Sequence, residues 1–574
     1  MTHPPRHRAA RALCLLLALT VGATPALQAQ VRLPALGESA SDEFNLSVEK
    51  RLGEQIMRDI RRDPDYVEDP VALDYLQSIW QPLVAAARQR GDIGSDVAAI
   101  FPFEIFLVRD RSVNAFALPG GYVGTHLGLI AMTATRDELA SVLAHELSHL
   151  TRRHIARSVD ASSRSSMLGL AAMILGVLAA SRSANADVAQ AAIATGQAAA
   201  AQLQLNFSRD MEREADRTGQ ALMAEAGFAP SGMAAMFNKL DAGIRLNDNG
   251  LFPYLRSHPL TIDRIGEAQQ RATQMQAGAA TNATAASAAS PSTAATGAAA
   301  TMATTPVNSP EALQQWHALM QSRAKVLMDP AVDSLRRWQE LDARQGSPEE
   351  RQAGLYAGAL ASMQLRDFGR AQRALAAALV LPGVAEPGLV RRAWLQLATQ
   401  LALARGDLTA AAHALRSMND EASRPALLLR AQVALASGDG AAQRSSVEAL
   451  QTWVSEHRND AQAWQQLALG AEAQGQALRA VRAAAEAQAA IGNLPGAIDR
   501  LRAGQQLARR MSTVSGSGSS ASSTVNGADF IDASVIDARL RDLQSQRREL
   551  LAEQRGNRRG SGRPEGSGGP DNPE

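Results

Sequence analysis

The sequence is short of several residue types, and each shortage excludes a class of protein. Lys and Arg together number 58 and Asp and Glu 57, so the formal net charge is only +1. Nucleic-acid-binding proteins normally carry a basic excess, so we expect no nucleic-acid partner. Aromatic residues make up 4% of the chain. Together with the abundance of alanine, this favours helices over sheet. Hydrophobic residues nevertheless reach 46%, which is enough to build packed cores.

Cysteine and long apolar runs are equally scarce. Cys14 is the only cysteine, and it lies in an apolar run that follows a basic N-terminus. With small residues up to Ala29, this pattern predicts a signal peptide over residues 1–29 and an exported protein without disulfides, either periplasmic or fully secreted. An uncleaved N-terminal anchor is the alternative. A second apolar run, residues 167–180, is too short to cross a bilayer. It predicts a buried helix or, alternatively, a helix in peripheral contact with a membrane.

The composition divides the rest of the chain into four parts. Residues 31–275 mix helical and strand patterns, and residues 276–309 are almost entirely Ala, Thr, Ser, Gly and Pro, as in a flexible linker. Residues 310–510 have a helical pattern throughout. Residues 511–574 read as a Ser/Gly linker, an amphipathic helix over residues 531–553 and a disordered tail.

The helical part is interrupted at intervals close to a tetratricopeptide repeat of about 34 residues. The interruptions lie at residues 367, 406–407, 438–439, 475–476 and 492–493. Such repeats would leave a concave face for a peptide-like partner. The alternative is an alanine-rich helical bundle without repeats.

Local patterns also predict the elements of the first part. Residues 41–62 and 71–90 read as amphipathic helices, residues 101–108 as a strand, and residues 113–130 as strands punctuated by glycine. Thr135, with a glutamate three residues later, forms a capping box that opens another helix.

That helix holds the chemical motif. His145-Glu146-Leu147-Ser148-His149 has the pattern H-E-x-x-H. Four residues turn an α-helix by about 400°, so the two histidines share a face and can both bind one zinc ion. Glu146 can act as the general base, because zinc makes the attacking water more acidic.

A catalytic zinc site needs a third protein ligand. Glu212 and Asp216 are four residues apart on a second predicted helix. We assign Glu212 to the metal and Asp216 to orienting a histidine ligand or donating a proton. An ordinary charged helix face is the alternative. Glu214 should point away from that face, and His154, about 140° round the helix from His149, should face the solvent.

Two further features fit a protease. Residues 114–122 are strand-like, and an edge strand here could pair with an extended substrate through Asn114, Ala115 and Phe116. A plain core hairpin is the alternative. His258 stands alone beside a proline, and most such histidines are structural or surface residues.

These motifs resemble the zinc metallopeptidases typified by HtpX and the CAAX prenyl protease. The exported form with C-terminal repeats is most similar to those members that enhance β-barrel assembly. The resemblance implies one zinc ion on His145, His149 and Glu212, with Glu146 as general base. It also implies that His258 is a removable fourth ligand that closes the site.

We therefore expect a mainly α protein. An α+β zincin-type metallopeptidase domain would precede the α-helical tetratricopeptide-like domain. The resemblance implies a periplasmic endopeptidase in the quality control and assembly of outer-membrane β-barrel proteins. Unfolded or stalled outer-membrane proteins would be its substrates, and the repeats would dock on them or on the β-barrel assembly machinery. A periplasmic chaperone or scaffold with minor or gated proteolysis is the alternative.

Overall fold

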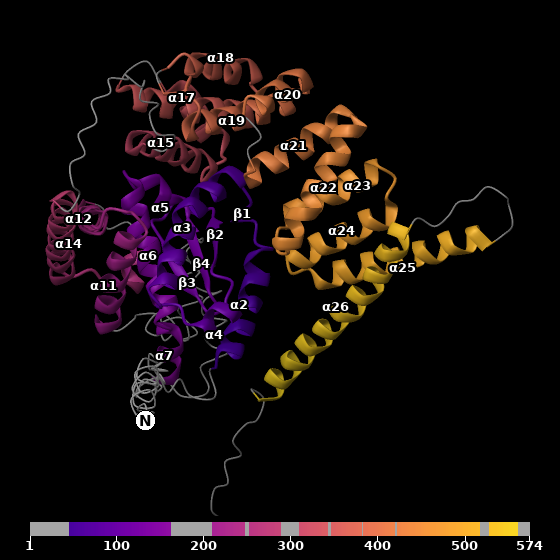
Figure 1. Ribbon diagram of the computed structural model, residues 1–574, viewed down its shortest axis with the longest axis horizontal. Coiled ribbons are helices and arrows are strands. Elements are labelled where there is room, and N and C mark those ends of the chain that lie inside the picture. The colour runs from indigo at the N-terminus through magenta and orange to yellow at the C-terminus, as the bar shows by residue number, and fades with distance from the viewer. Residues whose placement is uncertain are drawn as a thin grey trace, which may run out of the picture. The chain divides into compact units, whose positions relative to one another are not determined.

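The computed structural model describes residues 45–161, 209–246, 252–288, 309–341, 346–381, 383–418, 422–516 and 527–560. The predicted signal peptide and the apolar run 167–180 lie outside the described residues. Among the helices in the described ranges, none has an apolar stretch long enough to cross a membrane. These ranges are largely helical and include one small sheet (Figure 1). The expected mainly α fold is therefore confirmed.

Two long helices open the described chain close to their predicted positions. They are α2 (Leu46–Ile60) and α3 (Pro70–Gln89), and a short helix α4 (Ser95–Ile100) follows. The Asp69 side chain caps α3 by accepting a hydrogen bond from the backbone N–H of Ala72. A proline in the first turn favours this start, because its missing N–H has no partner within the helix there.

A four-stranded mixed sheet lies beside α3 (Figure 1). Its strands are β1 (Tyr66–Val67), β2 (Glu104–Val108), β3 (Ala115–Leu118) and β4 (Tyr122–His126). They lie in the order β1-β2-β4-β3, with β2 and β4 parallel and the other pairs antiparallel. Strand β3 is therefore at one edge of the sheet, as the substrate-pairing hypothesis requires.

Glycines make the turn between β3 and β4. Gly120 and Gly121 have φ angles of 78° and 90°, which L side chains rarely adopt. One expectation was wrong here, because the strand pattern extended to residue 130 and the structure has helix α5 (Leu127–Met132) instead. Leu127, Leu129 and Ile130 are all buried. A short, continuously apolar run of this kind does not distinguish a strand from a buried helix.

The H-E-x-x-H helix is α6 (Arg136–Thr151), and it is buried from Glu138 to Leu150. Thr135 caps it by accepting a hydrogen bond from the Glu138 N–H, as predicted. Helices α11 and α12, α3 and strand β3 all contact α6. The other helices of this part are α7 (His154–Ala161), α11 (Arg209–Glu225), α12 (Ser231–Leu246), α13 (Tyr254–Ser257) and α14 (Ile262–Ala288). Helix α14 continues into the segment 276–309 that was expected to be a linker.

The rest of the described chain is helical, as expected. Its helices are α15 (Pro310–Leu327), α16 (Val332–Glu340), α17 (Pro348–Gln364), α18 (Phe368–Leu379), α19 (Leu389–Arg405), α20 (Leu408–Arg416), α21 (Arg424–Ser437), α22 (Gly440–Glu456), α23 (Ala461–Ala473), α24 (Ala477–Ala490), α25 (Leu494–Gly516) and α26 (Gly527–Gly560). Helices that follow one another pack together, most extensively α23 on α24. The domain boundaries, and the assignment to tetratricopeptide repeats, stay predictions.

Every predicted interruption separates two helices. Gly406 ends α19 with a φ of 74°, and Asp407 caps α20 through a hydrogen bond from Ala410 N–H. Gly438 and Asp439 do the same between α21 and α22. In each case a glycine ends one helix and the following aspartate caps the next. The short turn between them brings the two helices side by side.

The first helix of this part packs directly on the part that holds H-E-x-x-H. Trp316 of α15 contacts Tyr75 of α3 edge-on, with ring centroids 5.0 Å apart. Arg323, 2% exposed, donates to both carboxylate oxygens of Asp69 at 2.7 Å. Because Asp69 also caps α3, one partly buried carboxylate links the start of α3 to the buried Arg323 of α15.

Candidate metal centre

Helix α6 brings the two motif histidines together in the interior. His145 and His149 are at most 1% exposed, and their Nε2 atoms lie 3.0 Å apart. Glu146 is fully buried. Burial raises the pKa of its carboxyl, more than the neighbouring histidines lower it. A carboxyl with a raised pKa is suited to exchange protons near neutral pH.

Helix α11 supplies the two predicted carboxylates. The oxygens of Glu212 lie 3.5 Å from Nε2 of His145 and from Nε2 of His149. One turn along, Asp216 accepts a hydrogen bond from Nδ1 of His145 at 2.9 Å. This is the geometry in which Glu212 faces a shared ion and Asp216 fixes the orientation of a ligand ring.

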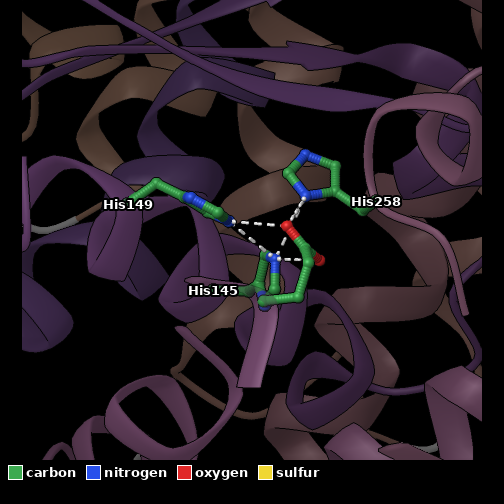
Figure 2. A group of neighbouring side chains, drawn as sticks. His145, His149 and His258 are labelled. Carbon is green, nitrogen blue, oxygen red and sulfur yellow. Dashed lines mark hydrogen bonds and ion pairs between the residues drawn. The ribbon is translucent and has the colours of Figure 1, made fainter. Parts of the chain in front are cut away.

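His258, just after α13, completes the group. Its Nδ1 lies 3.0 Å from Oε1 of Glu212 and 3.3 Å from Nε2 of His145. Its Nε2 lies 3.5 Å from Oε1 of Glu146. The ring of Tyr254 stacks on the His258 ring, with centroids 4.7 Å apart. Figure 2 shows the three histidine rings turned toward one another around a carboxylate.

The donor set fits a single zinc ion. One ligand atom from each of His145, His149, Glu212 and His258 lies within 4.8 Å of the others, and all four residues are buried. Imidazole nitrogen and carboxylate oxygen are the donors of catalytic zinc sites.

The local charges favour a cation at the same point. Burial opposes a charge on His145, yet Asp216 and Glu212 raise its pKa to about 9. Burial also opposes ionisation of Glu212, but His258 and His145 hold the pKa of its carboxyl far below the usual range. The carboxylate is therefore ionised, which is the form that binds a metal.

Arg264 is part of this site and was not predicted. Its guanidinium donates to both oxygens of Asp216, at 2.7 and 2.9 Å, and lies 2.8 Å from Oε2 of Glu212. It is 3% exposed. The bidentate contact with Asp216 and the ion pair with Glu212 hold both carboxylates in place beside the histidines. An arginine on α14 has no fixed sequence spacing from H-E-x-x-H, so no pattern pointed to it.

One prediction at the edge of the site was wrong. His154 was expected to face the solvent, but it is completely buried. Helix α6 ends at Thr151, and Arg153 has a φ of 51°, so His154 begins a new helix with a different direction. His154 contacts His149, and it also contacts Glu214. Glu214 is not one of the grouped ligands, as predicted, and pairs with His154 and Arg157 instead.

Strand β3 reaches the site from the other side. The backbone N–H of Ala117 donates to Oε2 of Glu146 at 3.0 Å. This N–H therefore points away from β4, toward the open edge of the strand. Of the proposed substrate-binding residues, Ala115 is fully buried and Asn114 and Phe116 are partly exposed. Their role in binding stays a prediction.

Comparison with known proteins identifies the chemistry. Residues 74–272 match the model of peptidase family M48. These residues are a peptidase family M48 domain. The domain contains every residue of the centre described above, and the expected metalloendopeptidase is confirmed. The family membership of the domain implies a bound metal ion.

Relatives of the chain are also named as proteases. The chain is 37% identical over 262 residues to a putative beta-barrel assembly-enhancing protease of Vibrio cholerae, covering 46% of this chain and 52% of that protein. It is 27% identical over 497 residues to the beta-barrel assembly-enhancing protease of Escherichia coli, covering 85% of this chain and 90% of that protein. The mitochondrial metalloendopeptidase OMA1 of Schizosaccharomyces pombe is 27% identical over 256 residues, which is 44% of this chain and 68% of that protein. The alignment thus spans about half the length of the Vibrio relative and most of the Escherichia relative.

Proposed function

We propose that the protein is a zinc-dependent endopeptidase of the periplasm that cleaves unfolded or stalled outer-membrane β-barrel proteins. The observation that carries the proposal is the convergence of His145, His149, Glu212 and His258 beside a buried Glu146. The donor set suits zinc, and the adjacent carboxylate supplies a base where peptide hydrolysis needs one.

The residues divide into three roles. His145, His149 and Glu212 would hold one zinc ion, and Asp216 and Arg264 would fix the positions of these ligands. When bound, zinc would polarise the scissile carbonyl and make the attacking water more acidic. Glu146 would then take a proton on its carboxylate from that water and return it to the leaving amine.

Strand β3 offers a way to position the substrate. It lies at the edge of the sheet, and its Ala117 N–H is bonded to Glu146. An extended peptide that pairs with this edge would lie alongside the proposed base. Backbone pairing gives affinity without strong sequence preference, which suits an enzyme that cuts misfolded proteins.

The substrate class rests on the relatives. Two are named beta-barrel assembly-enhancing proteases. The apolar and basic pattern of residues 1–29 supports export to the compartment through which outer-membrane proteins pass. Docking of the helical part on the β-barrel assembly machinery is part of this proposal.

A chaperone or scaffold with gated proteolysis is the second candidate. The observation that favours it is the His258 ring, which lies within hydrogen-bonding distance of Glu212 inside the ligand cluster. With that ring in place the centre is closed, and the helical part would then do the main work. A strain that carries only the Glu146→Gln variant distinguishes the two, since a scaffold keeps its function without the base.

The direct test is cleavage of an unfolded outer-membrane β-barrel protein by the purified chain. Glu146→Gln and a chelator-treated sample run alongside. We expect cutting by the wild type alone, with zinc retained in Glu146→Gln, because Glu146 is a base and not a ligand. Equal cutting by the Glu146→Gln variant would falsify the assignment of the base.

A further inference from the structure

Helix α26 packs on the neighbouring helices mainly through its first half (Figure 1). It contacts α24 and α25. Ile536, Leu540 and Leu543 are buried at this contact. From residue 544 to residue 552 none of its residues is buried. The second half of α26 therefore presents most of its surface to the solvent.

That second half is rich in arginine. Residues 541–559 hold six arginines, three acidic residues and no lysine. Successive residues of an α-helix are about 100° apart, so the six arginine positions fall within an arc of about 120°. We call this arc the arginine stripe. Its members are Arg541, Arg547, Arg548, Arg555, Arg558 and Arg559.

The acidic residues of the same stretch lie on the other side of the helix. Their positions are about 140–180° from the middle of the arginine stripe. Asp542, for example, pairs with Arg539, which is outside the stripe. Within the part of the chain that the structure describes, no carboxylate forms an ion pair with Arg541, Arg547 or Arg548. The positive charge of these three arginines is therefore not neutralised by the rest of the described chain.

Exposed apolar residues share the side of the arginine stripe. Leu551, 42% exposed, has a position inside the arc. Phe530, 70% exposed, lies near the start of α26 at an angle within the same arc. A helix with basic residues around exposed apolar ones is typical of segments that lie in the interface of a bilayer. The basic groups then contact lipid phosphates, and the apolar side chains enter the boundary between headgroups and acyl chains.

We propose that the arginine stripe, together with Leu551, binds the surface of a bilayer that contains anionic phospholipids. Clusters of about four to eight Lys or Arg residues on an amphipathic helix bind such surfaces. A guanidinium group can donate two parallel hydrogen bonds to one phosphate, which suits a phospholipid headgroup. Nucleic acid also offers phosphates, but it has no apolar layer for Leu551 and Phe530. The proposal is independent of the peptidase function, because no residue of the metal centre takes part.

The test is sedimentation with lipid vesicles. The mature chain, without the predicted signal peptide, is mixed with vesicles of equal parts phosphatidylcholine and phosphatidylglycerol, and the partition coefficient is measured. The double variant Arg547→Gln with Arg548→Gln should lower this coefficient about 30-fold, which is about fivefold for each arginine. The matched control is Arg370→Gln with Arg373→Gln on α18, where both arginines are exposed. It removes the same charge and should leave the coefficient unchanged.

A conservative double variant distinguishes a loss of charge from a loss of folding. Arg547→Lys with Arg548→Lys keeps both charges and should retain most of the binding. Vesicles of phosphatidylcholine alone should bind the parent chain weakly, because they carry no net charge. Equal partitioning of the parent chain and the double glutamine variant, or equal partitioning into both kinds of vesicle, would overturn the proposal.

A labelled oligothymidylate distinguishes a membrane from a nucleic acid as the partner. Leu551→Ser should weaken binding to the anionic vesicles about fivefold, because an apolar side chain no longer leaves water. Any binding of the oligothymidylate should not change in this variant. Binding of the parent chain to the oligothymidylate but not to the anionic vesicles would overturn the proposal in favour of a nucleic-acid ligand.

Discussion

Nδ1 of His154 lies 2.9 Å from Nδ1 of His149, and the opposite nitrogen of His154 lies 3.1 Å from Glu214. A His149 that binds metal through Nε2 carries its proton on Nδ1 and donates it to His154. His154 can then donate its own proton to Glu214. The chain thus orients each of its two motif histidines by a carboxylate, directly through Asp216 for His145 and through His154 for His149.

The first prediction follows from this arrangement. His154→Leu would leave the Nδ1–H of His149 without its acceptor in a buried position. We expect zinc affinity to fall about 10- to 100-fold, the usual effect of removing a group that orients a ligand. Competition with a chromogenic chelator measures it. Arg157→Gln is the control, because it removes an ion pair to Glu214 at 3.0 Å and leaves His154 in place. The same affinity in both variants would contradict the role of His154.

The second prediction separates the two carboxylates of α11. Glu212→Gln should reduce zinc occupancy more than Asp216→Asn, because Glu212 would bind the ion whereas Asp216 orients His145. Elemental analysis of both purified variants gives the zinc content. Full occupancy of Glu212→Gln would remove Glu212 from the ligand set, and the opposite order would exchange the two roles.

The third prediction concerns His258. If its ring closes the centre, His258→Ala should raise proteolysis of an unfolded substrate above the wild-type rate at equal zinc content. The exposed His457→Ala is the control and should behave as the wild type. An unchanged rate would contradict the gate, and a lower rate would show instead that His258 assists the reaction.

How much of the site was predictable depends on whether a spacing is local. Each group of correctly predicted site residues lies within one helix, where residues four apart share a face independently of the rest of the fold. These residues are His145, Glu146 and His149 on one helix and Glu212 and Asp216 on another. The structure brings the two helices together as that reasoning required. The overall helical content and the ends of the helices at Gly406 and Gly438 were predictable for the same reason.

The features that could not be predicted depend on where a helix is interrupted and on which helices pack together. The direction of the His154 side chain was predicted for one continuous helix. Arg153 has a positive φ and interrupts that helix, so the predicted direction was wrong. Arg264 reaches Asp216 only because α14 packs on α11. His317 had no partner pattern in the sequence, because its partners come from residues more than a hundred positions away.

His317 gives the fourth prediction, which is a dependence of stability on pH. Its Nε2–H donates to the backbone oxygen of Thr133 at 2.9 Å, and its Nδ1 accepts from the hydroxyl of Tyr75. The neutral ring is therefore fully paired where α15 joins α3. Burial, together with the charge of Arg136, lowers the pKa of His317 to about 4, although Thr133 opposes the shift.

The pKa of His317 is lower in the folded chain than in the unfolded chain, so the free energy of unfolding depends on pH. Below its ordinary pKa of 6.5 the unfolded chain takes up a proton that the folded chain refuses until about pH 4. The neutral His317 ring therefore contributes fully to the free energy of unfolding above about pH 6.5, and this contribution is lost as the pH falls toward 4. About 2 kcal/mol is lost by about pH 5. His317→Gln cannot titrate, so between about pH 7.5 and about pH 5 its urea midpoint should fall less than that of the wild type. His413→Gln on the exposed face of α20 is the control and should follow the wild type. Parallel losses in all three chains would mean that His317 takes up its proton in the folded state, and the junction between α15 and α3 would then not depend on a neutral ring.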